Sequence, residues 1–212
     1  MRTFDDSYGT YKYILPLLLD DPDYELRASI YSMFHCLDNF MNTIILELGR
    51  INEDNIVLER MANRSIKKFE ERLWFTTLWA DYYFFLNTVE RTYRLAMKLY
   101  IKLDFAQKAK EIRENKQFND ARLMRNKIEH IYEELAKHGE QFSHQYGSMG
   151  EKNRIEIDGV SFGASEDSLQ LLYQIYDDIS NIIVKKYIEP NKKVVDQIWA
   201  APSFQSHVEQ ND

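Results

Sequence analysis

The stretch WFTTLWADYYFFLNTVERTY, residues 74–93, decides the fold class predicted for this chain of 212 residues. Its large apolar side chains recur at steps of three or four residues, which is the spacing of one buried helix face. The pattern extends over residues 65–114 and predicts either one very long helix or two helices separated by a kink. The residues expected to face the core are Trp74, Leu78, Tyr82, Phe85, Val89 and Tyr93.

Two amphipathic segments precede this stretch. Apolar residues at helical spacing predict a helix over residues 24–49, and Gly49 is the expected stop because glycine is common just past a helix end. A short helix over residues 52–61 is expected to follow. The predicted core face of the first helix contains Ile30, Phe34, Leu37, Met41, Ile44 and Leu48.

The C-terminal third predicts a hairpin followed by a last long helix. Residues 154–162 alternate apolar and polar around an Asp-Gly pair, which is typical of two-residue hairpin turns. Ser165 is the expected N-cap of a helix that reaches about Ile188 and ends before Pro190. Its expected core residues are Leu169, Leu172, Ile175, Tyr176, Ile179 and Ile183.

These elements, with only 7 Gly and 4 Pro residues, predict an all-α fold. The expected architecture is an antiparallel helical bundle with a small β-hairpin insertion before the last long helix. The length fits a single helical domain over residues 1–202, followed by a disordered polar tail over residues 203–212.

Composition indicates the compartment and the classes of partner expected for the chain. The start has no apolar signal segment and no apolar run reaches the length of a membrane span, so a cytoplasmic protein with no membrane partner is expected. The lone Cys36 fits a reducing compartment. The net charge of −7 argues against bulk attraction to nucleic acid but allows a local basic surface.

One predicted helix carries several chemically useful side chains, in the string RNKIEHIY at residues 125–132. Asn119 or Asp120 is the expected cap of this helix, which reaches about Lys137. At roughly 100° per residue, its core face contains Met124, Ile128, Ile131 and Leu135.

The polar residues of the string occupy the other faces of the helix. Asn126 and His130 share a face roughly opposite the core, whereas Arg125 and Tyr132 lie on a flank about 90° from it. A solvated face on which Arg125 pairs with Glu129 is the simplest interpretation, and such a pair contributes only a few tenths of a kcal/mol, about 0.2–0.5.

The string resembles the motif of the HEPN domain family, which is Arg-polar-x3-His on a helix of an all-α bundle. Its extended form, Arg-x4-His-x-Tyr, is similar to that of HEPN toxins encoded beside minimal nucleotidyltransferase antitoxins. The close match covers about residues 122–137. The resemblance implies a metal-independent endoribonuclease, a toxin or phage-defence component, that cleaves RNA at a composite site between the two motif helices of a homodimer.

The resemblance also implies a role for each motif residue. Arg125 and His130 would be the catalytic pair, Asn126 would support them, and neither a cofactor nor a metal would take part. Tyr132 would be the residue that a nucleotidyltransferase antitoxin adenylylates. The residue types suit RNA cleavage, because histidine moves protons near neutral pH and a guanidinium binds two phosphate oxygens at once.

Basic residues on the predicted long helix form a second candidate feature. Four of them recur at steps of three or four residues and could follow an RNA backbone toward the motif, although a solvated face is the simpler interpretation. With two basic residues of the motif helix, the candidate RNA-binding residues are Arg91, Arg94, Lys98, Lys102, Arg122 and Lys127.

Other chemistries find less support in the sequence. His138 and His144 lack the partners of a zinc site. Glu111 and Glu114 give only the first half of the carboxylate pattern of all-α nucleotide pyrophosphohydrolases. The main alternative to a nuclease is a non-catalytic helical domain that dimerises or senses a nucleotide or RNA.

Overall fold

The computed structural model of the chain describes residues 23–62, 68–138, 149–150, 153–157, 159–193 and 197. Within these ranges, side chains are not described for residues 58, 61–62, 68–76, 131–138 and 149–150. The tail predicted over residues 203–212 and the side chains of three predicted core residues, Trp74, Ile131 and Leu135, therefore lie outside what the structure describes.

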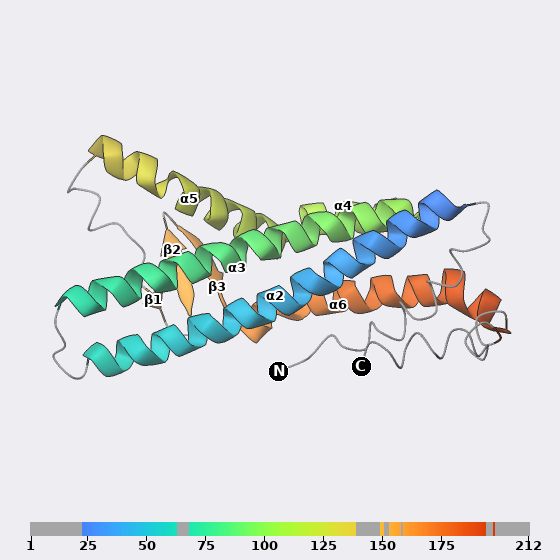
Figure 1. Cartoon of the computed structure of the whole chain (residues 1–212). Coiled ribbons are helices and arrows are strands. Elements are labelled where there is room, and N and C mark those ends of the chain that lie inside the picture. Colours follow the sequence, from blue (N-terminus) through green and yellow to red (C-terminus); the bar gives the residue numbers. More distant parts are fainter. Residues whose placement is uncertain are drawn as a thin grey trace.

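Helices make up most of the described chain, and the predicted all-α fold is confirmed. In Figure 1, α2 and α3 form one long antiparallel pair, α5 lies along α3, and α6 runs beside α2. The helices are α2 (Tyr24–Ala62), α3 (Lys68–Lys102), α4 (Ala106–Glu114), α5 (Lys116–His138) and α6 (Glu166–Ile183), and α6 continues through the π-helical turn η2 (Val184–Ile188) into the 3-10 turn η3 (Glu189–Asn191).

A small antiparallel sheet precedes α6 and contains the predicted hairpin. Strands β2 (Arg154–Ile157) and β3 (Val160–Gly163) pair with Ile157 opposite Val160, and Gly159 in the turn has a φ of 74°, which glycine adopts without strain. The sheet also contains a two-residue strand that was not predicted, β1 (Met149–Gly150), because so short a pairing has no alternating pattern to detect.

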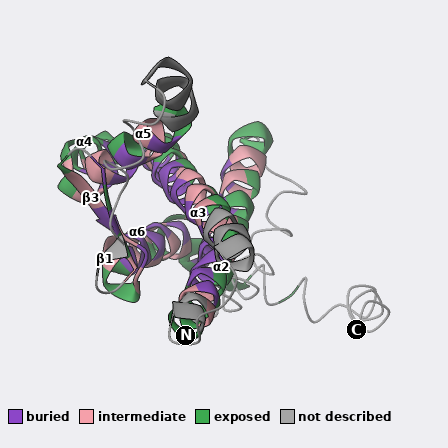
Figure 2. Ribbon diagram, turned by 90° about the vertical axis from the view of Figure 1, so that its left-hand side faces the viewer, coloured by how far each residue is buried: buried purple, intermediate pink, exposed green. Residues whose placement is uncertain are grey.

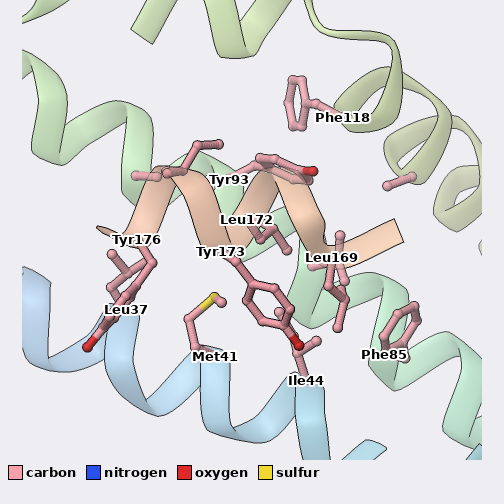
Figure 3. Close-up of a cluster of buried hydrophobic side chains, with 14 of the residues drawn as sticks. Leu37, Met41, Ile44, Phe85, Tyr93, Phe118, Leu169, Leu172, Tyr173 and Tyr176 are labelled. Atoms are coloured by element: carbon pink, nitrogen blue, oxygen red, sulfur yellow. The ribbon is translucent and has the colours of Figure 1, made fainter. Parts of the chain in front are cut away.

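The core lies where α2, α3 and α6 meet, and every predicted core residue whose side chain is described is buried. Figure 2 shows the buried residues on the inner faces of these helices. In the cluster of Figure 3, α6 packs between α2 and α3, and Tyr176 stacks on Phe34 with ring centroids 5.4 Å apart. Each such side chain stabilises the fold by about 1.5–3 kcal/mol relative to exposure, so these contacts dominate the folding energy.

Tyr82 of α3 joins the sheet to the helices. Its buried hydroxyl lies 2.7 Å from the carbonyl oxygen of Asn153 and 2.6 Å from that of Phe162, and one proton serves both acceptors. Burial raises the pKa of Tyr82, so the hydroxyl keeps that proton. Asn153 is also bonded from α2, where Asn55 donates to its Oδ1 at 2.6 Å and Asn52 accepts from its Nδ2 at 2.5 Å. The sheet is therefore fixed to both α2 and α3.

The predicted stop at Gly49 is wrong, because α2 continues through it to Ala62. The buried stripe does not end there, since Leu48 and Ile51 are both buried on either side of the glycine. A glycine inside a helix costs about 1 kcal/mol, less than the burial of one large apolar side chain contributes. Packing against α3 thus extends the helix beyond the point where local preference would end it.

Of the stretch predicted over residues 65–114, the described part, residues 68–114, contains two helices rather than one, as one of the two alternatives predicted. The break falls at Asp104, which has a φ of 71° between α3 and α4. Lys186 stabilises this turn from the C-terminal end of the fold, because its ammonium donates to the Leu103 carbonyl at 3.2 Å and to Asp104 at 2.7 Å. The turn between α3 and α4 is therefore stabilised by the Lys186 ammonium as well as by its own backbone conformation.

One of three predicted helix boundaries differs from the structure and two agree. The cap of α5 is Asn115, whose Oδ1 accepts from the Gln117 backbone N–H at 2.8 Å, so the predicted caps Asn119 and Asp120 are wrong. The predicted cap Ser165 is confirmed, since its hydroxyl accepts from the backbone N–H of the third helical residue. The predicted end of the last helix at about Ile188 agrees as well, because η2 ends there and Pro190 lies in the first turn of the separate 3-10 turn η3, at a position that needs no N–H donor.

None of the described helices combines the length and the apolar character needed to cross a membrane.

We predict that Tyr82→Phe lowers the free energy of unfolding by about 1–3 kcal/mol, because two buried carbonyl groups lose a shared donor. Urea denaturation followed by circular dichroism measures the loss. Tyr83→Phe is the matched control, since the Tyr83 hydroxyl bonds only to Glu129 at an exposed position. Equal losses in the two variants would contradict the role given to Tyr82.

Candidate active site on α5

The core face predicted for the motif helix is confirmed where side chains are described. Met124 and Ile128 are buried, and α5 contacts both α3 and β3. This packing fixes the rotation of α5 about its axis. Arg125 consequently lies on the flank that faces α3, and Asn126 and His130 lie farther from the core.

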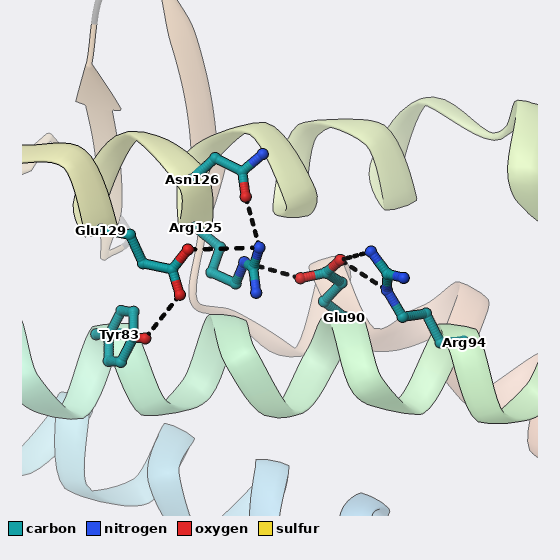
Figure 4. Close-up of polar contacts among 6 residues, drawn as sticks. All are labelled: Tyr83, Glu90, Arg94, Arg125, Asn126 and Glu129. Carbon is teal, nitrogen blue, oxygen red and sulfur yellow. Dashed lines mark hydrogen bonds and ion pairs between the residues drawn. The ribbon is translucent and has the colours of Figure 1, made fainter.

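Glu90 of α3 is the residue around which the site is arranged. Its side chain is only 3% exposed, yet it carries a charge opposite two arginines. Arg94 donates from Nε and Nη2 to Glu90 Oε1 at 2.8 and 2.6 Å, and Arg125 Nε makes an ion-pair contact of 2.9 Å with Oε2 (Figure 4). The buried carboxylate therefore links α3 to α5 through compensated charges.

Arg125 has further partners on its own helix. Its Nη2 donates to Asn126 Oδ1 at 2.6 Å and lies 3.4 Å from Glu129 Oε2, as the spacing of four residues predicted. Tyr83 of α3 donates to the other oxygen of Glu129 at 2.9 Å, and this hydrogen bond raises the pKa of Tyr83. Figure 4 shows the resulting chain of contacts from Tyr83 to Arg94. This network contains two arginines and two glutamates, so its formal charges sum to zero.

The structure gives less information on the other three motif residues, Asn126, His130 and Tyr132. His130 is exposed one helical turn beyond Asn126, which agrees with the predicted outward face. Asn126 is only partly exposed, because its side chain holds Arg125 rather than pointing alone into solvent. The side chain of Tyr132 lies outside the described residues. The structure thus brings Arg125 and Asn126 together and leaves His130 exposed one turn beyond Asn126.

All four basic residues predicted to follow RNA along α3 are exposed, but they are not equivalent. Arg94 is held by Glu90, whereas Arg91, Lys98 and Lys102 have no ion pair of this kind among the described contacts. On α5, Arg122 is exposed with its guanidinium 6.0 Å from the centre of the Phe118 ring, and Lys127 is partly buried.

Glu90 and Tyr83 are the site residues that sequence reasoning missed. The only sequence signal was that Glu90 lies four residues before Arg94, a spacing that predicts a pair within one helix. Nothing in that spacing predicts a contact with Arg125 on another helix, because the contact depends on how α5 is rotated and placed against α3.

A second polar cluster lies apart from the motif. A pocket of about 320 Å³ opens between α4 and α6, and Asp178 at one end accepts from Tyr100 at 2.7 Å and from Lys108 at 2.5 Å, both on Oδ2. Burial and the Asp178 contact raise the pKa of Tyr100. The cluster connects α3, α4 and α6 with its charges paired. Among the described residues, no three His, Cys, Asp or Glu side chains are grouped so as to hold a metal ion.

Comparison with known proteins gives no relative: no family model, no curated protein and no solved structure matches the chain.

We predict that Glu90→Gln lowers the free energy of unfolding by about 1–3 kcal/mol, because two guanidinium groups lose their shared buried counter-charge. Glu129→Gln is the matched control and should cost less than about 1 kcal/mol, since its side chain is 37% exposed. Thermal and urea unfolding at low and high salt measure both. If Glu129→Gln is the more destabilising change, Glu90 does not organise the site.

Proposed function

We propose that the chain is a HEPN-like, metal-independent endoribonuclease, a toxin or phage-defence component, that works as a homodimer. The observation that carries the proposal is the arrangement around Arg125. Buried Glu90 holds its guanidinium from one side, Asn126 accepts from it on the other, and His130 is exposed one turn farther along α5. An oriented cation beside an accessible histidine suits a reacting phosphodiester.

The proposed reaction needs no water and no metal. The ribose 2′ oxygen attacks the adjacent phosphorus and gives its proton to a histidine, while the bond from phosphorus to the 5′ oxygen breaks. A protonated histidine supplies the proton that the leaving oxygen needs. The products are a 2′,3′-cyclic phosphate and a 5′-hydroxyl end, and the charge on the pentavalent phosphate is stabilised by Arg125.

Arg125 can take part only if a phosphate replaces one of its carboxylate partners. The contact with Glu129 is the weaker one, at 3.4 Å and on a partly exposed side chain, so Glu129 is the group that the substrate displaces. Glu90 stays in place, because it is buried and is also held by Arg94. A single α5 supplies one His130, so a base and an acid of this type require two copies of the chain.

An apolar residue lies on the same exposed face. Leu123, Asn126 and His130 follow one another at steps of three and four residues, and Leu123 is an exposed large hydrophobic residue. A second copy packed there would cover Leu123 and bring two His130 side chains toward each other. This supports the homodimer in the proposal.

The proposal includes a modification and a partner. Tyr132 lies seven residues, about two helical turns, beyond Arg125 on the same predicted flank of α5, so a nucleotidyl group on its hydroxyl would obstruct the approach of a phosphate to Arg125. A nucleotidyltransferase antitoxin would add that group. Intact mass of natively expressed protein, compared with Tyr132→Phe, tests for it.

A second candidate function rests on the neutrality of the same network. Arg125 already has two carboxylate partners, which suits a helical domain that dimerises or senses a nucleotide or RNA without cutting it. In that case Arg125→Ala changes assembly or ligand affinity, and RNA stays intact.

We predict that purified protein cleaves RNA in the presence of EDTA and that His130→Ala lowers the rate by roughly 10²–10⁴-fold. His35→Ala is the matched control, because His35 is also exposed and also lies four residues from an asparagine, but on α2. Gel analysis of labelled RNA measures the rate, and the product ends should carry cyclic phosphate. Cleavage that survives His130→Ala, or no cleavage by either protein, refutes the nuclease proposal.

For RNA binding, we predict that Lys98→Ala weakens affinity for single-stranded RNA and reduces the slope of log Kd against log salt by about 0.7, the loss of one phosphate contact. Arg94→Ala should change the slope less, since Glu90 already neutralises Arg94. Arg60→Ala, an exposed change in the last turn of α2, is the control. Equal slopes for Lys98→Ala and Arg60→Ala would remove the α3 stripe from the binding surface.

A further inference from the structure

Away from α5, the seam between α2 and α3 contains a cluster of acidic side chains. Glu47 and Asp54, two helical turns apart on α2, are only 9% and 7% exposed, and both are affected by the charge of Asp81 on α3. Asp54 Oδ2 and Glu47 Oε2 are each buried without a hydrogen-bond donor among the described groups. An ionised carboxylate in this position loses hydration and gains no partner.

The cations near this cluster do not balance it. Arg50 is the cation that acts on Glu47 and Asp54, and its Nη1 contacts Glu47 Oε1 at 3.2 Å while most of its side chain is in solvent. Glu53, the next residue along α2, adds another negative charge. From the sheet, the contacts to this part of α2 come from the neutral side chain of Asn153. The seam therefore has more negative than positive charge.

The contact between Asp54 and Asp81 requires a proton. A hydrogen bond with the Asp81 side chain is one of the causes that raise the pKa of Asp54. Ionised carboxylates are acceptors only, so such a bond forms only when one of the two carries a proton.

We propose that Asp54 and Asp81 share a proton across the α2–α3 seam, so that mild acid tightens the helical pair and neutral to alkaline pH loosens it. The proposal is independent of the nuclease proposal, because it uses none of the motif residues. It makes the seam a pH-sensitive element of the fold. The seam adjoins the sheet, since Asn52 and Asn55 on either side of Asp54 hold Asn153.

The direction of the pH effect on stability follows from the raised pKa of Asp54. Burial first, and then the charge of Asp81, raise the pKa of Asp54 from 3.8 to about 6. Between these two values the folded chain binds more protons than the unfolded chain, so the free energy of unfolding falls as pH rises. The stabilising proton is present below pH 4 and has been lost above about pH 7.

The test compares the pH dependence of stability in three proteins: wild type, Asp54→Asn and Glu53→Gln. Asp54 alone should lower the wild-type folding equilibrium constant by about tenfold between pH 5 and pH 8. Asp54→Asn should abolish this tenfold difference, because an amide can donate to Asp81 at every pH. Glu53→Gln, an exposed change at the neighbouring position, should keep most of it, since the Glu53 charge is a smaller cause of the Asp54 shift than burial and Asp81. Urea denaturation at both pH values measures the constants.

A direct titration keeps the proposal testable if Asp54→Asn fails to fold. Carbon-detected NMR of the wild-type carboxyl groups should show one aspartate with a midpoint near 6, and Asp81→Asn should move that midpoint toward 4. An Asp54 midpoint near 4 in the wild type, or the same pH dependence in Asp54→Asn as in wild type, would overturn the shared proton.

Discussion

The burial of α3 is the constraint on which the rest of the structure depends. This helix contacts α2, α4, α5 and α6, and several polar side chains on its inner turns are partnered by a neighbouring element rather than by water. Asp81 meets Asp54 of α2, Tyr82 meets the sheet, and Glu90 meets Arg125 of α5. Apolar contacts supply most of the stability, and these few polar contacts determine where each neighbour docks.

The difference between what could and could not be predicted from sequence follows from that constraint. Helical spacing identified the core stripes, because burial on one face leaves a periodic trace in the chain. The hairpin turn and the Ser165 cap are local chemistry, and both were predicted correctly. Gly49 was mistaken for a helix end, since the packing that carries α2 past it comes from α3. The α5 cap was placed too late because buried Phe118 extends the core face toward Asn115.

In the candidate site too, some features could be predicted from the sequence and others could not. A helical wheel places Asn126 and His130 away from the core, and the structure agrees for both. It cannot place the guanidinium of Arg125, which lies on a long side chain and is held by a residue 35 positions earlier, Glu90. Arg94 fixes Glu90 on its other oxygen, and the guanidinium of Arg125 donates to Asn126. Contacts that exist before a ligand binds lower the cost of ordering the guanidinium.

Charge determines how an RNA could reach such a site on a chain of net charge −7. The Debye length is about 8 Å at physiological ionic strength, so distant acidic residues repel the RNA backbone only weakly near the surface. The Arg125 network is neutral and offers no long-range attraction. Under the proposed function, first contact would fall to exposed cations such as Arg91 and Lys98, which lie on α3 on either side of Arg94. Under the same proposal, a phosphate would compete with Glu129 for Arg125 only when already held nearby, which would confine chemistry at this site to strands bound along α3.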